Sequence, residues 1–219
     1  MKRTIIFIDG QNLHFALADI GLQEKDINWE VLFKYILPPD HELIRAYWYQ
    51  PARVAPFDFF PAELKRNCPE DMDEEEYLHD REVWLREQEN RLRHIQDSVY
   101  RRLQQENDFI EFCYAGILKI NPYFERFEER GVDVAIGVDM VSKVQGFDAA
   151  ILVSGDVDLL PAINYIKDKL KFVYQLVIKR GDYHNSNYGY SRGLMVAADK
   201  VLTVFESEVK DHENNLIRY

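Results

Sequence analysis

Short apolar runs alternate with helical patterns along most of this chain, and the alternation limits the folds that it can adopt. The runs at 4–8 and 149–154 are almost continuously apolar and rich in β-branched residues, which is typical of strands buried on both faces of a parallel sheet. Further strand candidates cover residues 43–51, 109–118 and 172–179. Helical patterns cover residues 28–37, 131–144 and 159–170. Strands joined through helices predict a parallel sheet with helices on both faces, which is an α/β fold.

The segment at about 52–105 departs from this rhythm. Its first part is rich in Pro and aromatic residues and is expected to be a loop. Its second part repeats apolar residues at helical spacing, namely Leu78, Leu85, Leu92, Ile95, Val99 and Leu103. Asp71 or Asp73 is placed to cap this helix. The stripe fits a helix packed on its own domain, and it also fits a helical arm that forms a homodimer with a second chain.

The length of the chain accommodates one large domain that carries an insertion. We expect this domain to cover residues 1–205, with the loop and long helix at about 52–105 inserted into it. The last segment, 206–219, is polar and is expected to form a frayed tail.

The formal net charge is −11 for 219 residues. Such a chain is a poor general binder of polyanions, because non-specific nucleic-acid affinity comes mostly from Lys and Arg on phosphates. A nucleic-acid role therefore needs a local basic patch or a metal ion that inverts the local field.

The cysteines and the N-terminus indicate the compartment. Cys68 and Cys113 lie far apart, so neither a zinc site nor a disulfide framework is suggested. Asp9 interrupts the first apolar run, so a signal peptide is not expected. No run approaches the roughly 18 apolar residues of a membrane span. We expect a cytoplasmic protein without membrane contact.

Carboxylates follow two of the predicted strands at the point where each strand ends. Asp9 follows the first strand, with Asn12 shortly after it, and Asp156 and Asp158 follow Ser154 at the end of the strand at 149–154. In a parallel sheet, ligands bind beyond the carboxyl ends of the strands. If the two strands are neighbours, these acids converge on one spot. The competing explanation is helix capping, which accounts for many single acids in such positions.

A third acidic element is the segment RGVDVAIGVDMV. Asp133 follows Gly131 and is expected to open a helix, and Asp139 lies six residues later. At about 100° per residue, these two side chains point roughly 120° apart. We expect Asp133 to face the other acids, whereas Asp139 has the alternative of a hydrogen bond to a neighbouring loop.

Several carboxylates a few Å apart cannot all stay ionised without a counter-charge. They hold protons or bind a metal, and an all-oxygen ligand set favours Mg²⁺ or Mn²⁺. The chain has no Gly-rich dinucleotide or P-loop motif after its first strand. An acid ring without a phosphate cradle suits an enzyme that reaches its phosphate through metals.

Together the segments FIDGQNL, RGVDVAIGVDM, LVSGDVDLLPAI and SRGLMVAADKVLTV resemble NYN domains, and more closely the LabA-like (DUF88) branch of the PIN-like nuclease superfamily. The resemblance implies a three-layer α/β/α sandwich and hydrolysis of RNA phosphodiesters at a Mg²⁺ or Mn²⁺ site. Carried over, Asp9 is the central metal ligand and a catalytic residue, and Asn12 orients a water or the substrate. Asp133, Asp156 and Asp158 complete the catalytic acidic ring, with the last two as further metal ligands, and Ser154 shapes the strand end.

The segment 179–193 is the candidate for substrate contact. It combines Lys179, Arg180 and Arg192 with several tyrosines, and such residues hold phosphates and stack on the unpaired bases of single-stranded RNA. A surface loop without a ligand is the alternative. For the whole chain, three functions stay open at this point: a metal-dependent ribonuclease, a non-catalytic RNA-binding or regulatory module, and a hydrolase of small phosphate esters.

Overall fold

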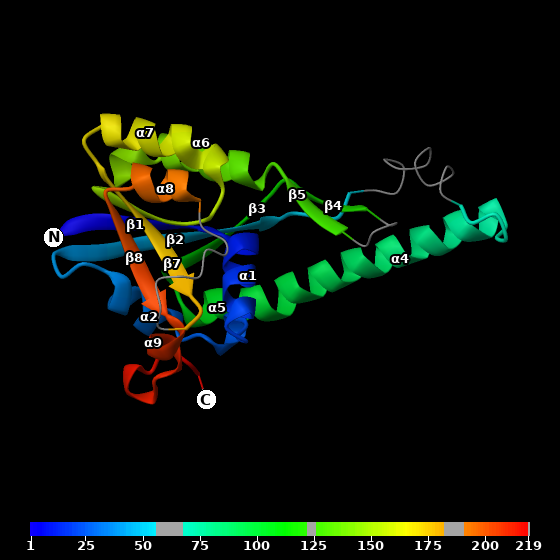
Figure 1. Cartoon of the computed structure of the whole chain (residues 1–219), viewed down its shortest axis with the longest axis horizontal. Helices are drawn as coiled ribbons and strands as arrows, with labels where there is room; N and C mark the ends of the chain where they lie inside the picture. The colour runs from blue at the N-terminus through cyan, green and yellow to red at the C-terminus, as the bar shows by residue number, and fades with distance from the viewer. Residues whose placement is uncertain (56–67, 122–125, 182–190, 219) are drawn as a thin grey trace.

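The structure is a computed structural model that describes residues 1–55, 68–121, 126–181 and 191–218. Its centre is a six-stranded sheet in the order β3-β2-β1-β6-β7-β8, in which each neighbouring pair is parallel. The strands are β1 (Lys2–Asp9), β2 (His41–Pro51), β3 (Ile110–Ala115), β6 (Ala149–Val153), β7 (Phe172–Lys179) and β8 (Lys200–Phe205). Helices cover both faces of this sheet (Figure 1), and the predicted α/β class is confirmed.

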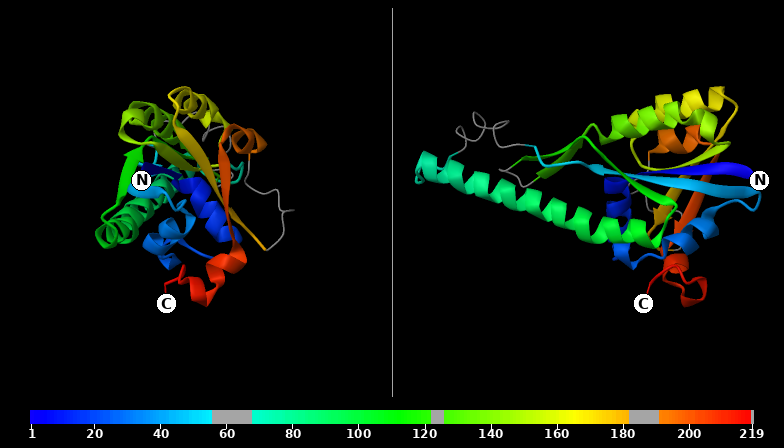
Figure 2. Two further views of the ribbon diagram at one scale, coloured as in Figure 1. Left: turned by 90° about the vertical axis from the view of Figure 1, so that its left-hand side faces the viewer. Right: turned by 180° about the vertical axis from the view of Figure 1, so that it is seen from behind.

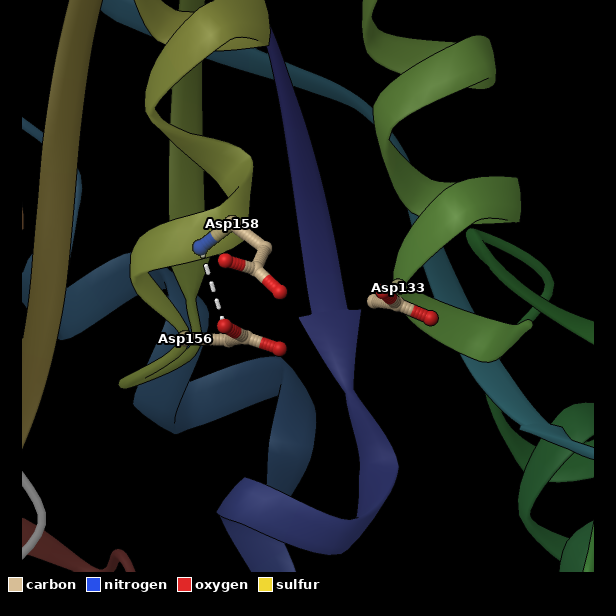
Figure 3. Close-up of side chains that lie close together, drawn as sticks. All are labelled: Asp133, Asp156 and Asp158. Atoms are coloured by element: carbon tan, nitrogen blue, oxygen red, sulfur yellow. Dashed lines mark hydrogen bonds between the residues drawn. The ribbon is translucent and has the colours of Figure 1, made fainter. Parts of the chain in front are cut away.

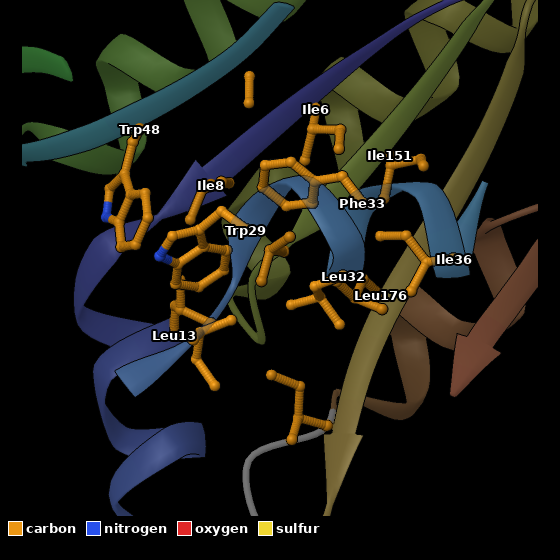
Figure 4. Packing of buried hydrophobic residues seen from close by; sticks show 14 of the residues in the cluster. Ile6, Ile8, Leu13, Trp29, Leu32, Phe33, Ile36, Trp48, Ile151 and Leu176 are labelled. Carbon is orange, nitrogen blue, oxygen red and sulfur yellow. The ribbon is translucent and has the colours of Figure 1, made fainter. Parts of the chain in front are cut away.

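The central strand β1 is buried on both faces because its alternate residues enter two different cores. Ile6 and Ile8 belong to one apolar cluster, and Ile5 and Phe7 belong to the other. Figure 4 shows the first cluster, where Trp29 and Phe33 pack beside Ile6 and Ile8. The continuous apolar run that predicts this strand therefore fills both layers of the sandwich.

The helices divide between the two faces of the sheet. Helices α6 and α7 pack on one face with α8 beside them, and α1, α2, α5 and α9 lie on the other (Figures 1 and 2). The helices are α1 (Gly10–Asp19), α2 (Trp29–Ile36), α4 (Glu74–Ile95), α5 (Arg101–Glu106), α6 (Val132–Ser142), α7 (Leu160–Asp168), α8 (Arg192–Ala197) and α9 (Glu206–Lys210). Short 3₁₀ turns cover Glu24–Asp26, Val144–Gly146, Val157–Leu159 and His212–Asn214.

The predicted long helix is present as α4, which projects away from the sheet together with a β-hairpin (Figure 1). Asp73 caps it by accepting hydrogen bonds from the backbone N–H groups of Glu75 and Glu76. A π-helical turn, Gln96–Tyr100, joins it to α5.

The apolar stripe of this helix packs largely against its own chain. Leu85 and Leu92 pack in a small apolar cluster with Ile120 of the hairpin. Val99 and Leu103 pack in the larger apolar cluster on one face of the sheet. These contacts are those expected of a helix packed on its own domain. Pairing of the helix with a second chain stays a prediction.

The predicted strand at 109–118 is wrong in its extent, because the chain bends at Gly116. β3 ends at Ala115, and β4 (Ile117–Asn121) then pairs in antiparallel register with β5 (Arg126–Arg130). Gly116 has φ +65°, and a Cβ there would lie 2.1 Å from the carbonyl oxygen of Arg130. Only glycine tolerates both constraints, so one apolar run becomes two strands in different sheets.

The segment 206–219 is polar as expected, but it is not a frayed tail, because two of its apolar side chains pack on the domain. Val209 and Leu216 are buried in a main core. The backbone N–H of Asn28 donates to the carbonyl oxygen of Leu216, and the N–H of Arg218 donates to that of Asp26. Two apolar side chains at suitable positions are enough to dock an otherwise polar segment.

Among the described residues, no helix has the length and apolar character needed to cross a membrane.

Candidate metal centre at the carboxyl end of the sheet

The strand order places the predicted acids at the point where the sheet changes direction. The chain builds outward from β1 through β2 to β3, and then from β6 through β7 to β8 on the other side. β1 and β6 are therefore neighbours, and the crevice beyond their carboxyl ends is the usual ligand site of such a sheet. Because the two strands are neighbours, Asp9 and the segment that carries Asp156 lie close together at this edge of the sheet.

Asp9, Asn12 and Ser154 form a hydrogen-bonded link between these two strand ends. Asp9 is buried, and it caps α1 by accepting from the backbone N–H of Asn12 at 3.0 Å. Its other oxygen accepts from the Asn12 amide at 2.6 Å and from the Ser154 hydroxyl at 3.0 Å. The Asn12 side chain in turn accepts from the N–H of Gly155 at 3.1 Å. The link holds the loop after β6 against the start of α1.

Three further carboxylates lie close to one another beside these hydrogen-bonded residues. Asp133, Asp156 and Asp158 each offer one oxygen, and these oxygens all lie within 4.8 Å of one another. Figure 3 shows Asp156 and Asp158 on one side of the end of β1 and Asp133 on the other, at the start of α6. We call these three residues the acid cluster.

Local geometry fixes each member of the acid cluster. Asp156 caps a 3₁₀ turn by accepting from the N–H of Asp158 at 2.9 Å, and its own N–H donates to the Ser154 hydroxyl at 3.0 Å. Asp133 stands in the first turn of α6, directly after Gly131. The φ of +83° at Gly131 turns the chain from β5 into that helix. The positive end of the α6 dipole favours a carboxylate there.

The acid cluster lines a cavity with a volume of about 370 Å³. Asp9 lines this cavity too, but it is not a member of the acid cluster. Burial raises its pKa, and the bonds from Asn12 and Ser154 oppose that rise. Its two oxygens accept three hydrogen bonds, so it retains little of the capacity of an ionised carboxylate for a direct ligand. In the structure Asp9 supports the site from its floor, through its hydrogen bonds with Asn12 and Ser154. Its predicted role as central metal ligand stays a prediction.

Asp139 lies away from the acid cluster. It accepts a hydrogen bond from the Tyr49 hydroxyl at 2.7 Å and pairs with Lys143 at 2.9 Å. These partners satisfy a charged group in an apolar helix. The alternative role of Asp139, a hydrogen bond to a neighbouring part of the chain, describes this position, but the partner Tyr49 lies on strand β2 and not on a loop as expected.

The sequence reasoning missed Glu129, which lines the cavity together with Asp9 and the acid cluster. Burial, followed by the charge of Asp9, raises its pKa to about 7. Glu129 belongs to β5 of the protruding hairpin, and its surroundings in the sequence, RFEER, look like a solvated charged strand. Only the turn at Gly131 brings it to the site, so no sequence signal identifies it.

The predicted substrate contacts lie at the end of the neighbouring strand β7 and at the start of α8. Lys179 ends β7, which pairs with β6, so it stands at the same carboxyl edge as the acids. Arg180 follows Lys179, and its guanidinium nitrogen lies 3.8 Å from a carboxylate oxygen of Asp19. Arg192 is exposed at the start of α8. The residues between them, 182–190 with their tyrosines, are outside the described part of the chain.

Comparison with known families agrees with this geometry. The model of the NYN domain matches residues 3–204. The chain belongs to the NYN domain family. NYN domains are of the PIN-like nuclease type, and the elements that carry the match include the ends of β1 and β6 and the start of α6. No curated protein matches the chain.

One solved structure shares the fold of this NYN domain. It is the crystal structure of VPA0982, a protein of unknown function from Vibrio parahaemolyticus RIMD 2210633. The two agree with a TM-score of 0.52 at 16% sequence identity, over 99% of this chain and 96% of that chain. At this identity the likeness shows a shared α/β fold alone.

The donor set fits a hard divalent cation. The acid cluster offers only carboxylate oxygens, which suit Mg²⁺ or Mn²⁺ better than a thiolate- or imidazole-seeking ion. Like charges this close need a counter-charge. The acid cluster is therefore compatible with a metal site at this edge of the sheet.

Proposed function

We propose that this NYN domain is a metal-dependent ribonuclease that hydrolyses phosphodiester bonds of single-stranded RNA. The observation that carries the proposal is the acid cluster, in which two separate chain segments bring three carboxylate oxygens within 4.8 Å of one another. Capping explains Asp156, and the helix dipole favours Asp133 at the start of α6, but neither effect requires the three acids to meet. The family to which the chain belongs supports the same chemistry.

In this proposal Asp133, Asp156 and Asp158 hold Mg²⁺ or Mn²⁺, with Asp9 beneath them. When bound, the ion supplies a Lewis acid and lowers the pKa of a water. Asp9 supports the loop after β6 through Ser154 and Asn12. This support keeps Asp156 and Asp158 in place when the substrate phosphate approaches, and such preorganisation is what catalysis requires.

Glu129 is a further candidate to exchange a proton in this cavity, because it lines the cavity beside the acid cluster and position comes before pKa in the choice of a general acid or base. In the metal-free protein its pKa is raised to about 7, and a bound cation would lower it. Asp133 and Asp158 are the alternative acceptors of the proton from the attacking water. Lys179, Arg180 and Arg192 would contact phosphates on either side of the scissile bond.

The experiment is an incubation of the purified chain with end-labelled single-stranded RNA and Mn²⁺. We expect cleavage that disappears with EDTA and with Asp156→Asn, and that persists in Asp139→Asn, whose carboxylate lies outside the acid cluster. Circular dichroism of each variant verifies the fold. Intact RNA with the wild type, despite tight Mn²⁺ binding, would exclude the general nuclease and leave a binding module of the same fold.

A further inference from the structure

An open apolar groove runs between α6 and α7 and ends at the acid cluster. It has a volume of about 650 Å³, and its described lining contains no basic residue. Asp133 and Asp158 line both this groove and the acidic cavity, as does Val134. A molecule held at the acid cluster therefore has the groove directly beside it.

The walls of the groove expose more apolar surface than packing requires. Val134 and Val138 are 62% and 59% exposed, and with Val141 they follow the i, i+4, i+7 spacing of one helix face. Tyr165 of α7 lines the groove and is 38% exposed. Contiguous exposed apolar surface on a folded domain marks a site of interaction.

The charge of the surroundings restricts what this groove can hold. Phosphates are repelled by an acidic chain except where a metal offsets the charge. A nucleobase is neutral, apolar on its faces and able to stack on a tyrosine. The Lys169 ammonium lies 5.0 Å from the centroid of the Tyr165 ring, so a base would stack on the face of the ring opposite this cation.

A protein partner fits the groove less well. A second chain laid along it would cover Asp133 and Asp158, and burying carboxylates without a counter-charge is costly. An RNA strand avoids this cost, because its phosphate reaches those same acids through the metal.

We propose that the groove between α6 and α7 is a base-binding subsite for an unpaired nucleotide next to the scissile phosphate. This inference rests on the proposed ribonuclease function, and it identifies the substrate as a single strand with accessible bases. The base lies along Val134 and Val138 and stacks on Tyr165, while its phosphate lies at the acid cluster.

The test compares a fluorescein-labelled octaribonucleotide with the same strand carrying abasic riboses. Dissociation constants come from stopped-flow fluorescence anisotropy in Mn²⁺, and the same mixtures are later run on a gel to measure cleavage. The groove variants are Tyr165→Ala and Val138→Asn. Their matched controls are Tyr114→Ala and Val196→Asn, which are exposed residues outside the groove lining.

We expect the wild type to bind the base-bearing strand at least about fivefold more tightly than the abasic strand, since one stacked base contributes about that factor or more. The groove variants lose this preference and the controls keep it. Binding of base-bearing RNA with this preference but without cleavage supports the subsite and refutes the nuclease. Cleavage with equal affinity for both strands overturns the subsite and keeps the nuclease. Absence of binding to either strand overturns the subsite. Dissociation of a dimer by the groove variants, measured by sedimentation with unchanged RNA affinity, also overturns it, because the groove is then an interface.

Discussion

Removing one charge from the acid cluster should stabilise the metal-free protein. In Asp133→Asn, two repulsive pairs disappear, those with Asp156 and Asp158. Charges 4.8 Å apart repel by about 1 kcal/mol in a water-like dielectric, which is the appropriate value for partly exposed acids. The variant also loses the favourable interaction of Asp133 with the N-terminus of α6, about 0.3–1 kcal/mol. The net gain is about 1–1.7 kcal/mol in the free energy of unfolding.

Thermal unfolding followed by circular dichroism measures both consequences of this change. In EDTA we expect the Tm of Asp133→Asn to rise by about 2–7 °C, at about 2–4 °C per kcal/mol for a chain of this size. Mn²⁺ at a hundred times its Kd stabilises the wild type by about 2.7 kcal/mol, and this increase should largely vanish in the variant. Asp108→Asn, an exposed aspartate just before β3 and at the opposite end of the sheet, should change neither quantity. A lower Tm in EDTA, or an undiminished response to Mn²⁺, would refute the reasoning.

Three further changes test the surroundings of the site. Ser154→Ala removes one donor from buried Asp9 and should lower the free energy of unfolding by about 1–3 kcal/mol in urea titrations; unchanged stability would show that the bond contributes nothing. The raised pKa of Glu129, about 7, means that the folded metal-free protein holds an extra proton between the ordinary glutamate pKa and about 7. Its stability should therefore fall as the pH rises through that window, and Glu129→Gln should flatten this slope; equal slopes in both proteins would contradict the assignment. Gly116→Ala places a Cβ 2.1 Å from the Arg130 carbonyl oxygen at φ +65° and should cost at least about 1–3 kcal/mol, whereas a neutral effect in the same titration would show that the turn readily rearranges.

The parts of the fold that follow from local patterns could be predicted from the sequence. The apolar run of β1 needs two covered faces, so it has to be a central strand, and the same reasoning applies to β6. Once both strands are central and parallel, Asp9 and Asp156 must fall at one edge of the sheet. The long helix follows from its own spacing and from the capping residue Asp73.

The remaining parts depend on contacts that the sequence does not encode locally. Gly116 divides one apolar run because another segment passes close to it, and the pattern of apolar residues contains no trace of that neighbour. β8 is an edge strand with few buried residues, which weakens its signal. The polar segment at the C-terminus docks through two buried side chains, Val209 and Leu216. In each case tertiary packing decides a segment whose local preference is weak.

The same dependence on tertiary contacts explains why Glu129 joins the site. It belongs to the hairpin that protrudes with α4, and Gly131 alone separates that hairpin from the helix that carries Asp133. The β4 strand of this hairpin contributes Ile120, which packs with Leu85 of α4 in one apolar cluster. The β4–β5 hairpin is thereby fixed to the acidic cavity at one end and to the long helix α4 at the other. A carboxyl that titrates near neutral pH thus reaches the site from a projecting element, whereas the acid cluster comes from the turns that open α6 and lead into α7. This division keeps the acid cluster on elements that pack in a main core of the domain, and a metal site requires its ligands to be held in place by such packing.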